Sequence, residues 1–482
     1  MPNFIGIDFG TTRSTVAVYA CTDREHKVKK VERPILSIAA INRTSGECYY
    51  GIDAQDKITE DYYYIPSLKD LLDKKLYQEF GGVLVTRDSI LRGYFEYLKG
   101  LAADFNVNEI VLAIPNDFPM KRRSVLRSAA ELAGFEIKTF VTEPVAAFFA
   151  SYSRLAGYEE SAILRNCENV AIFDWGGGTL DVTVMQCASG IVKELAKKRM
   201  DCAGNAIDER VAQCVHHWIS EKKGKSKSFE DMTSYSQYQM KQFVEEVKIN
   251  LNGLDVSITE DTITIPDYDD YGIVTQEISK KTFNECIEYI IDAAIEILRK
   301  TIEESRLGVG GIDKILLVGG SSKLHLLQEK MKAEFGDKLL ISSGDSDWGV
   351  AVGAALLSAA PGDFIVNQDV SLKLCDGSVY PLIKKDEHIS EYQEKTQSYF
   401  FGKVDCSEKA DFTFTGSEDI DKSANKYLSI QTANVWDELI QLEVSIDENM
   451  IVNVVASCQG LPGGARRWSY ANLSCRYELP ND

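Results

Sequence analysis

Two stretches of the sequence decide the fold: FIGIDFGTTRSTVAVY at residues 4–19 and VAIFDWGGGTLDVTVM at residues 170–185. Each has an apolar strand, a turn rich in glycine and threonine, and a second strand with alternating valines, which is the pattern of a β-hairpin. When the two stretches are superimposed, Asp8 matches Asp174 and Gly10 matches Gly176. Two distant copies of one motif predict two related lobes and exclude a solenoid of short repeats.

The turns of these hairpins carry the groups that bind phosphate. They share small residues and hydroxyl donors, namely Gly10, Thr11 and Thr12 in the first hairpin, Gly176, Gly177, Gly178 and Thr179 in the second, and Gly319, Gly320 and Ser321 in a third turn after the apolar run 314–318. Glycine lets the backbone approach a phosphate closely and present N–H groups to it. One such turn alone would fit an ordinary loop, but the three together predict a phosphate site between two lobes.

Carboxylates stand beside these turns. Asp8 and Asp174 end the first strand of each hairpin, and Asp181 lies on the return strand of the second. An unpaired carboxylate at the end of an apolar strand is costly, and a hydrated Mg²⁺ that bridges phosphates would satisfy all three. No G-x-x-x-x-G-K-[ST] stretch occurs, which excludes a P-loop, and no G-x-G-x-x-G opens a helix, which disfavours a dinucleotide fold.

Composition limits the class of protein. A chain of 482 residues predicts two or three domains. A formal net charge of −20 argues against binding to a nucleic-acid backbone. The eleven cysteines are scattered without a C-x-x-C pair, which indicates reduced thiols. Neither a signal-peptide pattern nor an apolar stretch of membrane-spanning length is expected, so we expect a cytoplasmic protein without membrane contacts.

The pattern of apolar residues divides the chain into two parts. Helical spacing predicts helices at residues 122–133, 205–221, 236–251, 282–305 and 351–360, the last of them ended by Pro361-Gly362. From about residue 368, alternating segments at 410–416, 427–432, 439–446 and 451–457 predict an all-β module. We therefore expect an α/β part at 1–360, a linker at 361–368 and a β-rich domain at 369–482.

Taken together, DFGTT, DWGGGTLD and VGGSSKL resemble the superfamily of actin, sugar kinases and heat-shock chaperones. Within it, LAIPNDFPMKRRSVLRSAAELAGFEIKTFVTEPVAAFFASY (112–152) and, more loosely, residues 381–390 and 442–457 resemble the seventy-kilodalton heat-shock chaperone (DnaK-type) family. The resemblance covers about residues 3–360 and 368–457. It implies an α/β actin-like ATPase of two lobes followed by a β-sandwich that binds peptides.

The resemblance also implies a role for each matched residue. Asp8, Asp174 and Asp181 would hold the water shell of Mg²⁺, and Lys69 and Glu143 would act with Asp181 and Thr179 on the γ-phosphate and the attacking water. ATP or ADP would be the nucleotide, with K⁺ as a further ion. The nucleotide-binding set would be Asp8, Gly10, Thr11, Thr12, Arg13, Asp174, Gly176, Gly177, Gly178, Thr179, Gly204, Glu245, Lys248, Asn252, Gly319, Gly320, Ser321, Lys323 and Asp347.

Plainer interpretations stay open for several of these residues. Lys69 alone would be a solvated helix charge, and Glu143 before Pro144 would suit a helix start. Glu245 and Lys248, three residues apart, would fit a surface pair, and Lys323 an N-terminal helix charge. Trp175 and Trp348 are interpreted as core residues and not as platforms for a ligand.

The sequence departs from the family pattern at several positions. Ile249 stands where the family has an arginine that stacks on adenine, which predicts base binding weaker by about 0.5–2 kcal/mol, and Asn252 replaces a serine.

Thr139, Pro119 and Met120 stand where the family docks J-domain co-chaperones, so this docking site diverges, whereas Pro115 matches a proline linked to interlobe signalling. The linker FIVN (364–367) is less apolar than the family's. Residues 460–482 continue as strand and loop, so no helical lid over bound peptide is expected, and faster peptide exchange follows.

The leading hypothesis is an ATP-dependent chaperone, in which slow ATP hydrolysis regulates the grip of the β domain on unfolded or extended polypeptide. Its partners would include a J-domain co-chaperone and a nucleotide-exchange factor. The alternative is a nucleotide-gated scaffold with little ATPase activity that docks one dedicated protein. A sugar kinase or a filament-forming protein would leave residues 368–482 unexplained.

Overall fold

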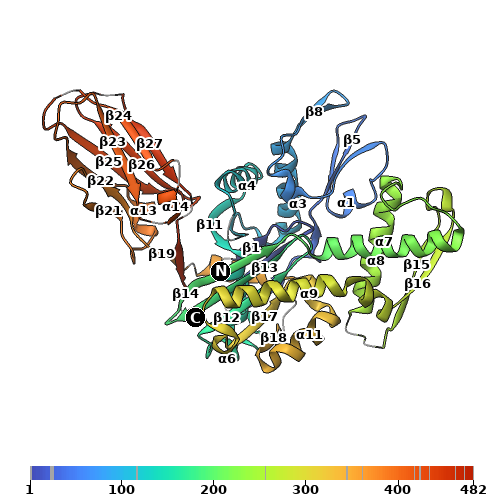
Figure 1. Cartoon of the computed structure of the whole chain (residues 1–482). Helices are drawn as coiled ribbons and strands as arrows, with labels where there is room; N and C mark the ends of the chain where they lie inside the picture. Colours follow the sequence, from blue (N-terminus) through green and yellow to red (C-terminus); the bar gives the residue numbers. More distant parts are fainter. Residues whose placement is uncertain are drawn as a thin grey trace.

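The computed structural model describes residues 3–21, 26–115, 118–253, 255, 257–342, 346–360, 362–416, 418–422, 425–433, 435–461, 463–471 and 473–480. Asn116 and Asp117 of the family-like segment, and Pro361 of the expected helix end and linker, lie outside these ranges. Figure 1 shows the β-rich C-terminal part standing to one side of the α/β part.

The first hairpin belongs to a mixed sheet with the order β11-β10-β1-β2-β3, and β4 also pairs with β2. Its strands are β1 (Asn3–Asp8), β2 (Arg13–Cys21), β3 (His26–Lys30), β4 (Ile35–Leu36), β10 (Glu109–Ile114) and β11 (Glu136–Thr142). The antiparallel pairing of β1 with β2 confirms the predicted hairpin, and β1, β10 and β11 run parallel. We call residues 3–152, which are built on this sheet, lobe I. Its helices are α1 (Ile52–Gln55), α2 (Leu68–Leu71), α3 (Arg87–Leu101), α4 (Met120–Leu132) and α5 (Glu143–Tyr152).

The second hairpin belongs to a sheet with the order β18-β17-β12-β13-β14-β28-β19. Its strands are β12 (Asn169–Trp175), β13 (Leu180–Ala188), β14 (Ile191–Met200), β17 (Lys314–Val318), β18 (Leu339–Ile341), β19 (Asp363–Val366) and β28 (Cys475–Glu478). Strands β12 and β13 form the predicted hairpin, in which Asp174 lies opposite Asp181, and β17 runs parallel to β12. We call residues 169–341 lobe II.

Small residues let one buried helix pack closely against lobe I. Helix α12 (Gly349–Ala359) is almost entirely buried and contacts α5, β1, β2 and β10. A Cβ at Gly353 would lie 1.8 Å from the carbonyl oxygen of Ala146 in α5, so only glycine permits this approach. Trp175 and Trp348 are also buried, which agrees with their interpretation as core residues.

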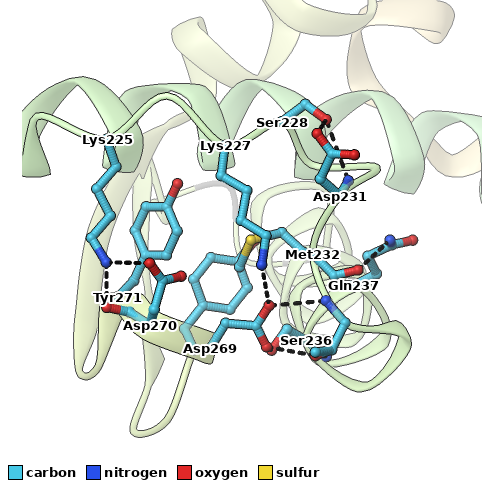
Figure 2. A network of polar contacts seen from close by, with 12 residues as sticks. Lys225, Lys227, Ser228, Asp231, Met232, Ser236, Gln237, Asp269, Asp270 and Tyr271 are labelled. Carbon is cyan, nitrogen blue, oxygen red and sulfur yellow. Dashed lines mark hydrogen bonds and ion pairs between the residues drawn. The ribbon is translucent and has the colours of Figure 1, made fainter.

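The three helices predicted after the second hairpin are present as α7 (Gly204–Lys223), α8 (Ser234–Leu251) and α9 (Lys280–Glu304), with the hairpin β15 (Glu260–Ile265) and β16 (Val274–Ser279) between α8 and α9. Figure 2 shows how the turn after β15 holds the start of α8. Asp269 accepts hydrogen bonds from the Thr233 backbone at 2.9 Å and the Ser236 hydroxyl at 2.7 Å, and it pairs with Lys227 at 3.3 Å. Burial alone would raise the pKa of Asp269, but these partners lower it to about 2. The helix that carries Glu245 and Lys248 is thereby fixed at its first turn.

The C-terminal part contains two four-stranded antiparallel sheets, with the orders β21-β20-β23-β24 and β22-β25-β26-β27. Their strands are β20 (Val370–Lys373), β21 (Val379–Ile383), β22 (Gln397–Gly402), β23 (Lys409–Thr415), β24 (Tyr427–Gln431), β25 (Leu439–Ile446), β26 (Val452–Cys458) and β27 (Arg466–Tyr470). Alternating side chains of both sheets, such as Phe414 and Leu442, share one buried core. The predicted alternation is thus the inner and outer faces of a β-sandwich.

Strand pairing departs from the expected boundaries at the linker and at the end of the chain. The sequence pattern predicts a connector at 361–368 and a β-rich domain over all of 369–482. In the structure, Asp363–Val366 form β19, and β28 pairs with β19 on one side and with β14 of lobe II on the other. Hydrophobic alternation cannot reveal this, because it specifies the buried face of a strand and not its edge partner.

The sandwich also touches lobe I. The Arg127 guanidinium of α4 donates hydrogen bonds to the Asn449 side chain at 2.9 Å and to the Glu448 carbonyl at 2.9 Å, in the turn between β25 and β26. Arg123 donates to the Asn449 carbonyl at 3.0 Å. Arg127 is 7% exposed and stacks over Phe140 at 4.9 Å, so lobe I presents it in a fixed position. Within the described residues, every helix is too short or too polar to cross a membrane.

Candidate active site

Four carboxylates and one lysine meet where the two hairpins face each other. Asp8 is the last residue of β1, Asp174 is the residue before the last of β12, and Asp181 is the second residue of the return strand β13. Lys69 of α2 donates a hydrogen bond to Glu143, the first residue of α5, at 2.8 Å. The side chains of this ion pair are 13% and 12% exposed. The structure therefore joins Lys69 and Glu143, 74 residues apart in sequence, and neither is a solvated surface charge.

The carboxylates are held against their own repulsion. Burial raises the pKa of Asp8 to about 7, with Glu143 adding to the rise and Lys69 opposing it. Burial also raises the pKa of Asp174 well above its usual range, and Glu143, Asp181 and Asp8 raise it further. For Lys69, burial lowers the pKa, but Glu143, Asp8 and Asp181 more than compensate, so that it is raised overall. A cation in this place would relieve an excess of negative charge.

The third carboxylate is oriented by the turn of its own hairpin. The Thr179 hydroxyl donates a hydrogen bond to Asp181 at 2.8 Å. Burial raises the pKa of Asp181, as does Glu143, whereas Thr179, Arg199 and Lys69 lower it. Thr179 and Asp181 were both predicted from the sequence, but Arg199 of β14 was not, because its pairing opposite Asp181 depends on the sheet register.

The phosphate turns of the two lobes lie against each other. A Cβ at Gly177 would lie 2.2 Å from the Thr12 hydroxyl, and a Cβ at Gly178 would lie 2.8 Å from Thr11. The backbone N–H of Gly204 donates to the Gly176 carbonyl at 3.1 Å, and the Ser321 hydroxyl donates to the same carbonyl at 2.7 Å. Glycine is required here because side chains would separate the two turns.

Other predicted turn residues lie around the same cleft. Gly10 follows β1, and its Cβ would lie 2.1 Å from the Arg13 carbonyl. Gly319 has φ 82°, which favours glycine, and a Cβ there would lie 2.8 Å from Asp174. A Cβ at Gly320 would likewise lie 2.8 Å from a carboxylate oxygen of Asp347. The third turn thus lies directly beside the carboxylate of the second hairpin.

Several charged and polar residues of the predicted nucleotide-binding set are engaged with protein groups. Arg13 pairs with Glu245 across the lobes at 2.8 Å, Lys248 pairs with Asp208 at 2.7 Å, and Lys323 pairs with Asp347 at 2.6 Å. Asn252 accepts a hydrogen bond from the His325 backbone at 2.9 Å and caps α8. Ile249 is 54% exposed on the same helix. A nucleotide would have to compete with these ion pairs or displace them.

A cavity of about 620 Å³ lies between the lobes, next to the first phosphate turn. Of the predicted residues, it is lined by Thr12, Arg13 and Glu245. Asn205 and Asp208 of α7 also line it and were missed by the sequence analysis. Asn205 accepts a hydrogen bond from the Thr12 hydroxyl at 3.1 Å. Helical spacing after Gly204 was the only signal that could have pointed to them.

The carboxylate of Asp208, which lines this cavity, shows what kind of ligand group would fit there. One of its carboxylate oxygens is buried without a hydrogen-bond partner in the structure. Burial raises the pKa of this carboxyl to about 6, although Lys248 opposes the rise. An unsatisfied buried acceptor facing a cavity suits a ligand that brings a hydroxyl or amino donor. The residues present therefore fit a nucleotide.

The carboxylate set also fits a hydrated cation. Among the described residues, no group of three or more His, Cys, Asp or Glu side chains is arranged to hold a metal ion directly. Asp8, Asp174 and Asp181 are all desolvated, and Asp8 and Asp181 both lie near enough to Asp174 for their charges to raise its pKa. Mg²⁺ dehydrates reluctantly and usually keeps several of its waters, so contacts through water suit this arrangement.

A family model described as Hsp70 protein matches residues 24–459. The chain belongs to the Hsp70 family. Hsp70 proteins are ATPases that bind ATP or ADP with Mg²⁺. They also bind unfolded polypeptides, J-domain partners and exchange factors. The match includes the α/β part from residue 24 onward and most of the β-sandwich, so the two parts share one family assignment.

Proposed function

We propose that this protein is an ATP-dependent Hsp70-type chaperone, in which ATP hydrolysis regulates the grip of the sandwich on extended polypeptide. The observation that carries the proposal is the buried ion pair between Lys69 and Glu143, set beside Asp8, Asp174 and Asp181. Phosphoryl transfer to water requires positioning and charge neutralisation more than covalent chemistry. A lysine with a raised pKa and an oriented carboxylate supply both.

Each residue of this set has a separate task in the proposal. Lys69 stays charged and keeps Glu143 in one orientation, so that Glu143 and Asp181 can accept a hydrogen bond from an attacking water. Thr179 restrains Asp181 by donating its hydroxyl hydrogen bond to that carboxylate. The backbone N–H groups of the glycine turns would face the phosphate oxygens. Bound Mg²⁺ would neutralise phosphate charge, held through water by Asp8, Asp174 and Asp181.

The sandwich offers an apolar surface for the polypeptide. Five exposed apolar side chains gather at the end where the loops after β22, β24 and β26 meet: Val404, Val435, Trp436, Leu439 and Leu461. The loops are held from inside by Lys403, which donates to Thr432 at 2.8 Å, and by Glu438, which accepts from the Ala433 backbone at 3.0 Å. Exposed aromatic and aliphatic groups on a rigid support are typical of protein-binding surfaces.

A second candidate is a nucleotide-gated scaffold with little ATPase activity. The observation that favours it is the engagement of Glu245 and Lys248 in ion pairs, with Ile249 exposed beside them. A nucleotide that must break two ion pairs, and whose base finds no stacking partner in the protein, binds less tightly. In this candidate ATP would bind, and the sandwich would hold one partner without turnover.

Turnover by the full chain separates the two candidates. ATP hydrolysis is measured with and without an unfolded polypeptide, for the unchanged protein, for Lys69→Ala, and for Lys74→Ala as a matched control at an exposed lysine. The chaperone predicts stimulation by polypeptide, a loss of about a hundredfold in Lys69→Ala, and no change in Lys74→Ala. ATP binding without turnover in the unchanged protein would support the scaffold and reject the chaperone.

A further inference from the structure

Two cysteines of lobe II meet between α7 and α9, away from the cleft. Cys214 lies in the second half of α7 and is partly exposed, and Cys286 lies near the start of α9 and is 7% exposed. Cys214 packs against the core cluster that contains Cys286. Both thiols are free in the structure.

The packing of the two helices brings these side chains together independently. Arg210 lies one turn before Cys214 and places its guanidinium 5.9 Å from the ring centre of Tyr289, one turn after Cys286. Residues three or four apart lie on the same helix face. The contact between Arg210 and Tyr289 therefore sets the α7 face that bears Cys214 against the α9 face that bears Cys286.

The surroundings make Cys214 the more reactive thiol. The nearby Cys286 thiol and the charges of Arg210 and His217 favour the thiolate of Cys214, so that the pKa of Cys214 is lowered to about 6 in spite of partial burial. The pKa of Cys286 is raised far above its ordinary value by the nearby Cys214 thiol and by burial. A partly exposed thiolate beside a buried thiol has the arrangement of an attacking and a resolving cysteine.

We propose that Cys214 and Cys286 form a peroxide-responsive pair that closes reversibly to a disulfide between α7 and α9. The Cys214 thiolate attacks hydrogen peroxide, the O–O bond breaks, and Cys214 becomes a sulfenic acid with release of hydroxide, which takes up the proton that Cys214 lost on ionisation. The Cys286 sulfur then attacks the Cys214 sulfur, the S–O bond breaks, and the thiol proton leaves with the hydroxide as water. Two thiols are oxidised by two electrons, and one peroxide is reduced to two waters. A dithiol reductant reverses the reaction.

The disulfide would restrain a helix that begins at the phosphate turns. The first two residues of α7, Gly204 and Asn205, donate backbone hydrogen bonds to Gly176 and Gly177 at 3.1 and 2.8 Å. Oxidation would therefore link α7, whose first residues make these contacts, covalently to α9. The chemistry of the pair does not depend on ATP hydrolysis, so its test stands apart from the test of the proposed function.

The test uses the full chain, reduced and then exposed to hydrogen peroxide. After free thiols are alkylated, mass spectrometry of peptides should find Cys214 joined to Cys286, with the link lost after dithiothreitol. In Cys286→Ser, Cys214 should stop at a sulfenic acid that dimedone traps. The variant Cys375→Ser/Cys406→Ser, which removes two exposed thiols, is the matched control and should still form the link. Oxidation of Cys375 and Cys406 in the unchanged protein while Cys214 and Cys286 stay reduced would overturn the proposal.

The pH dependence of alkylation gives a second readout that needs no variant. Between pH 7 and pH 8, a thiol of pKa about 6 gains only about 1.1-fold in thiolate, whereas an unperturbed thiol of pKa about 8.5 gains about eightfold. Alkylation of Cys214 by iodoacetamide should therefore be almost flat over this range. An eightfold rise at Cys214 would show an ordinary thiol and contradict the proposal.

Discussion

The strand β28 gives the sharpest test of the structure, because it ties the end of the chain to lobe II. Its central residue, Tyr477, is 3% exposed and belongs to the core that lies between the lobes. The Tyr477 ring packs against Phe364 of β19 with centroids 4.8 Å apart, and its hydroxyl accepts a hydrogen bond from the Gly362 backbone at 3.0 Å. The substitution Tyr477→Ala removes the ring and this bond together.

The magnitude follows from burial. A buried aromatic side chain removes about 150–250 Å² from water, and about 25 cal/mol per Å² gives about 4–6 kcal/mol as an upper bound. Truncations of buried aromatic residues to alanine cost about 3–5 kcal/mol. We therefore expect Tyr477→Ala to lower the free energy of unfolding of the α/β part by about 3–5 kcal/mol. The variant Tyr477→Phe keeps the ring and should cost about 1 kcal/mol for the lost hydrogen bond.

The assay is urea denaturation followed by far-ultraviolet circular dichroism and by tryptophan fluorescence. Tyr427→Ala on β24 serves as the control, because Tyr427 is 63% exposed and its loss should change stability by less than about 0.5 kcal/mol. If Tyr477→Ala is as mild as Tyr427→Ala, β28 does not pack on lobe II, and the sheet order β14-β28-β19 is refuted.

Three further predictions follow from the site and the sandwich. The folded-state pKa of Asp8, about 7, lies above its ordinary 3.8, so Asp8 contributes stability that is fully present below about pH 4 and is lost as pH rises to 7. Without nucleotide, Asp8→Asn should remove this dependence, at most about 4 kcal/mol, and a stability profile across pH 4–7 that matches the unchanged protein would contradict it. Arg127→Ala removes charged donors worth about 1.5–3 kcal/mol each, so hydrogen exchange of amides 447–451 should rise about tenfold or more; unchanged exchange would mean that the turn is not docked. Trp436→Ala should weaken binding of an apolar peptide at least tenfold in fluorescence anisotropy, and equal affinity would place the peptide elsewhere.

Local patterns in the sequence determined much of this protein. The glycine and threonine turns, the strand-ending Asp8 and Asp174, and the alternating strands of the sandwich were all visible, because each depends on residues near one another in the chain. The joining of Lys69 to Glu143 could be inferred only through the family resemblance. Their ion pair depends on how α2 and α5 pack, and no local periodicity encodes that distance.

Tertiary structure alone decided which edges and faces meet. The sequence predicts strand and loop over residues 460–482 but does not name β14 and β19 as the neighbours of β28, since backbone hydrogen bonds at a strand edge carry no side-chain signature. The same holds for Arg13 with Glu245, for Asn205 with Thr12, and for Cys214 with Cys286. A sequence shows which side chains are buried or charged, whereas the partner of each is selected by the packing of elements far apart in the chain.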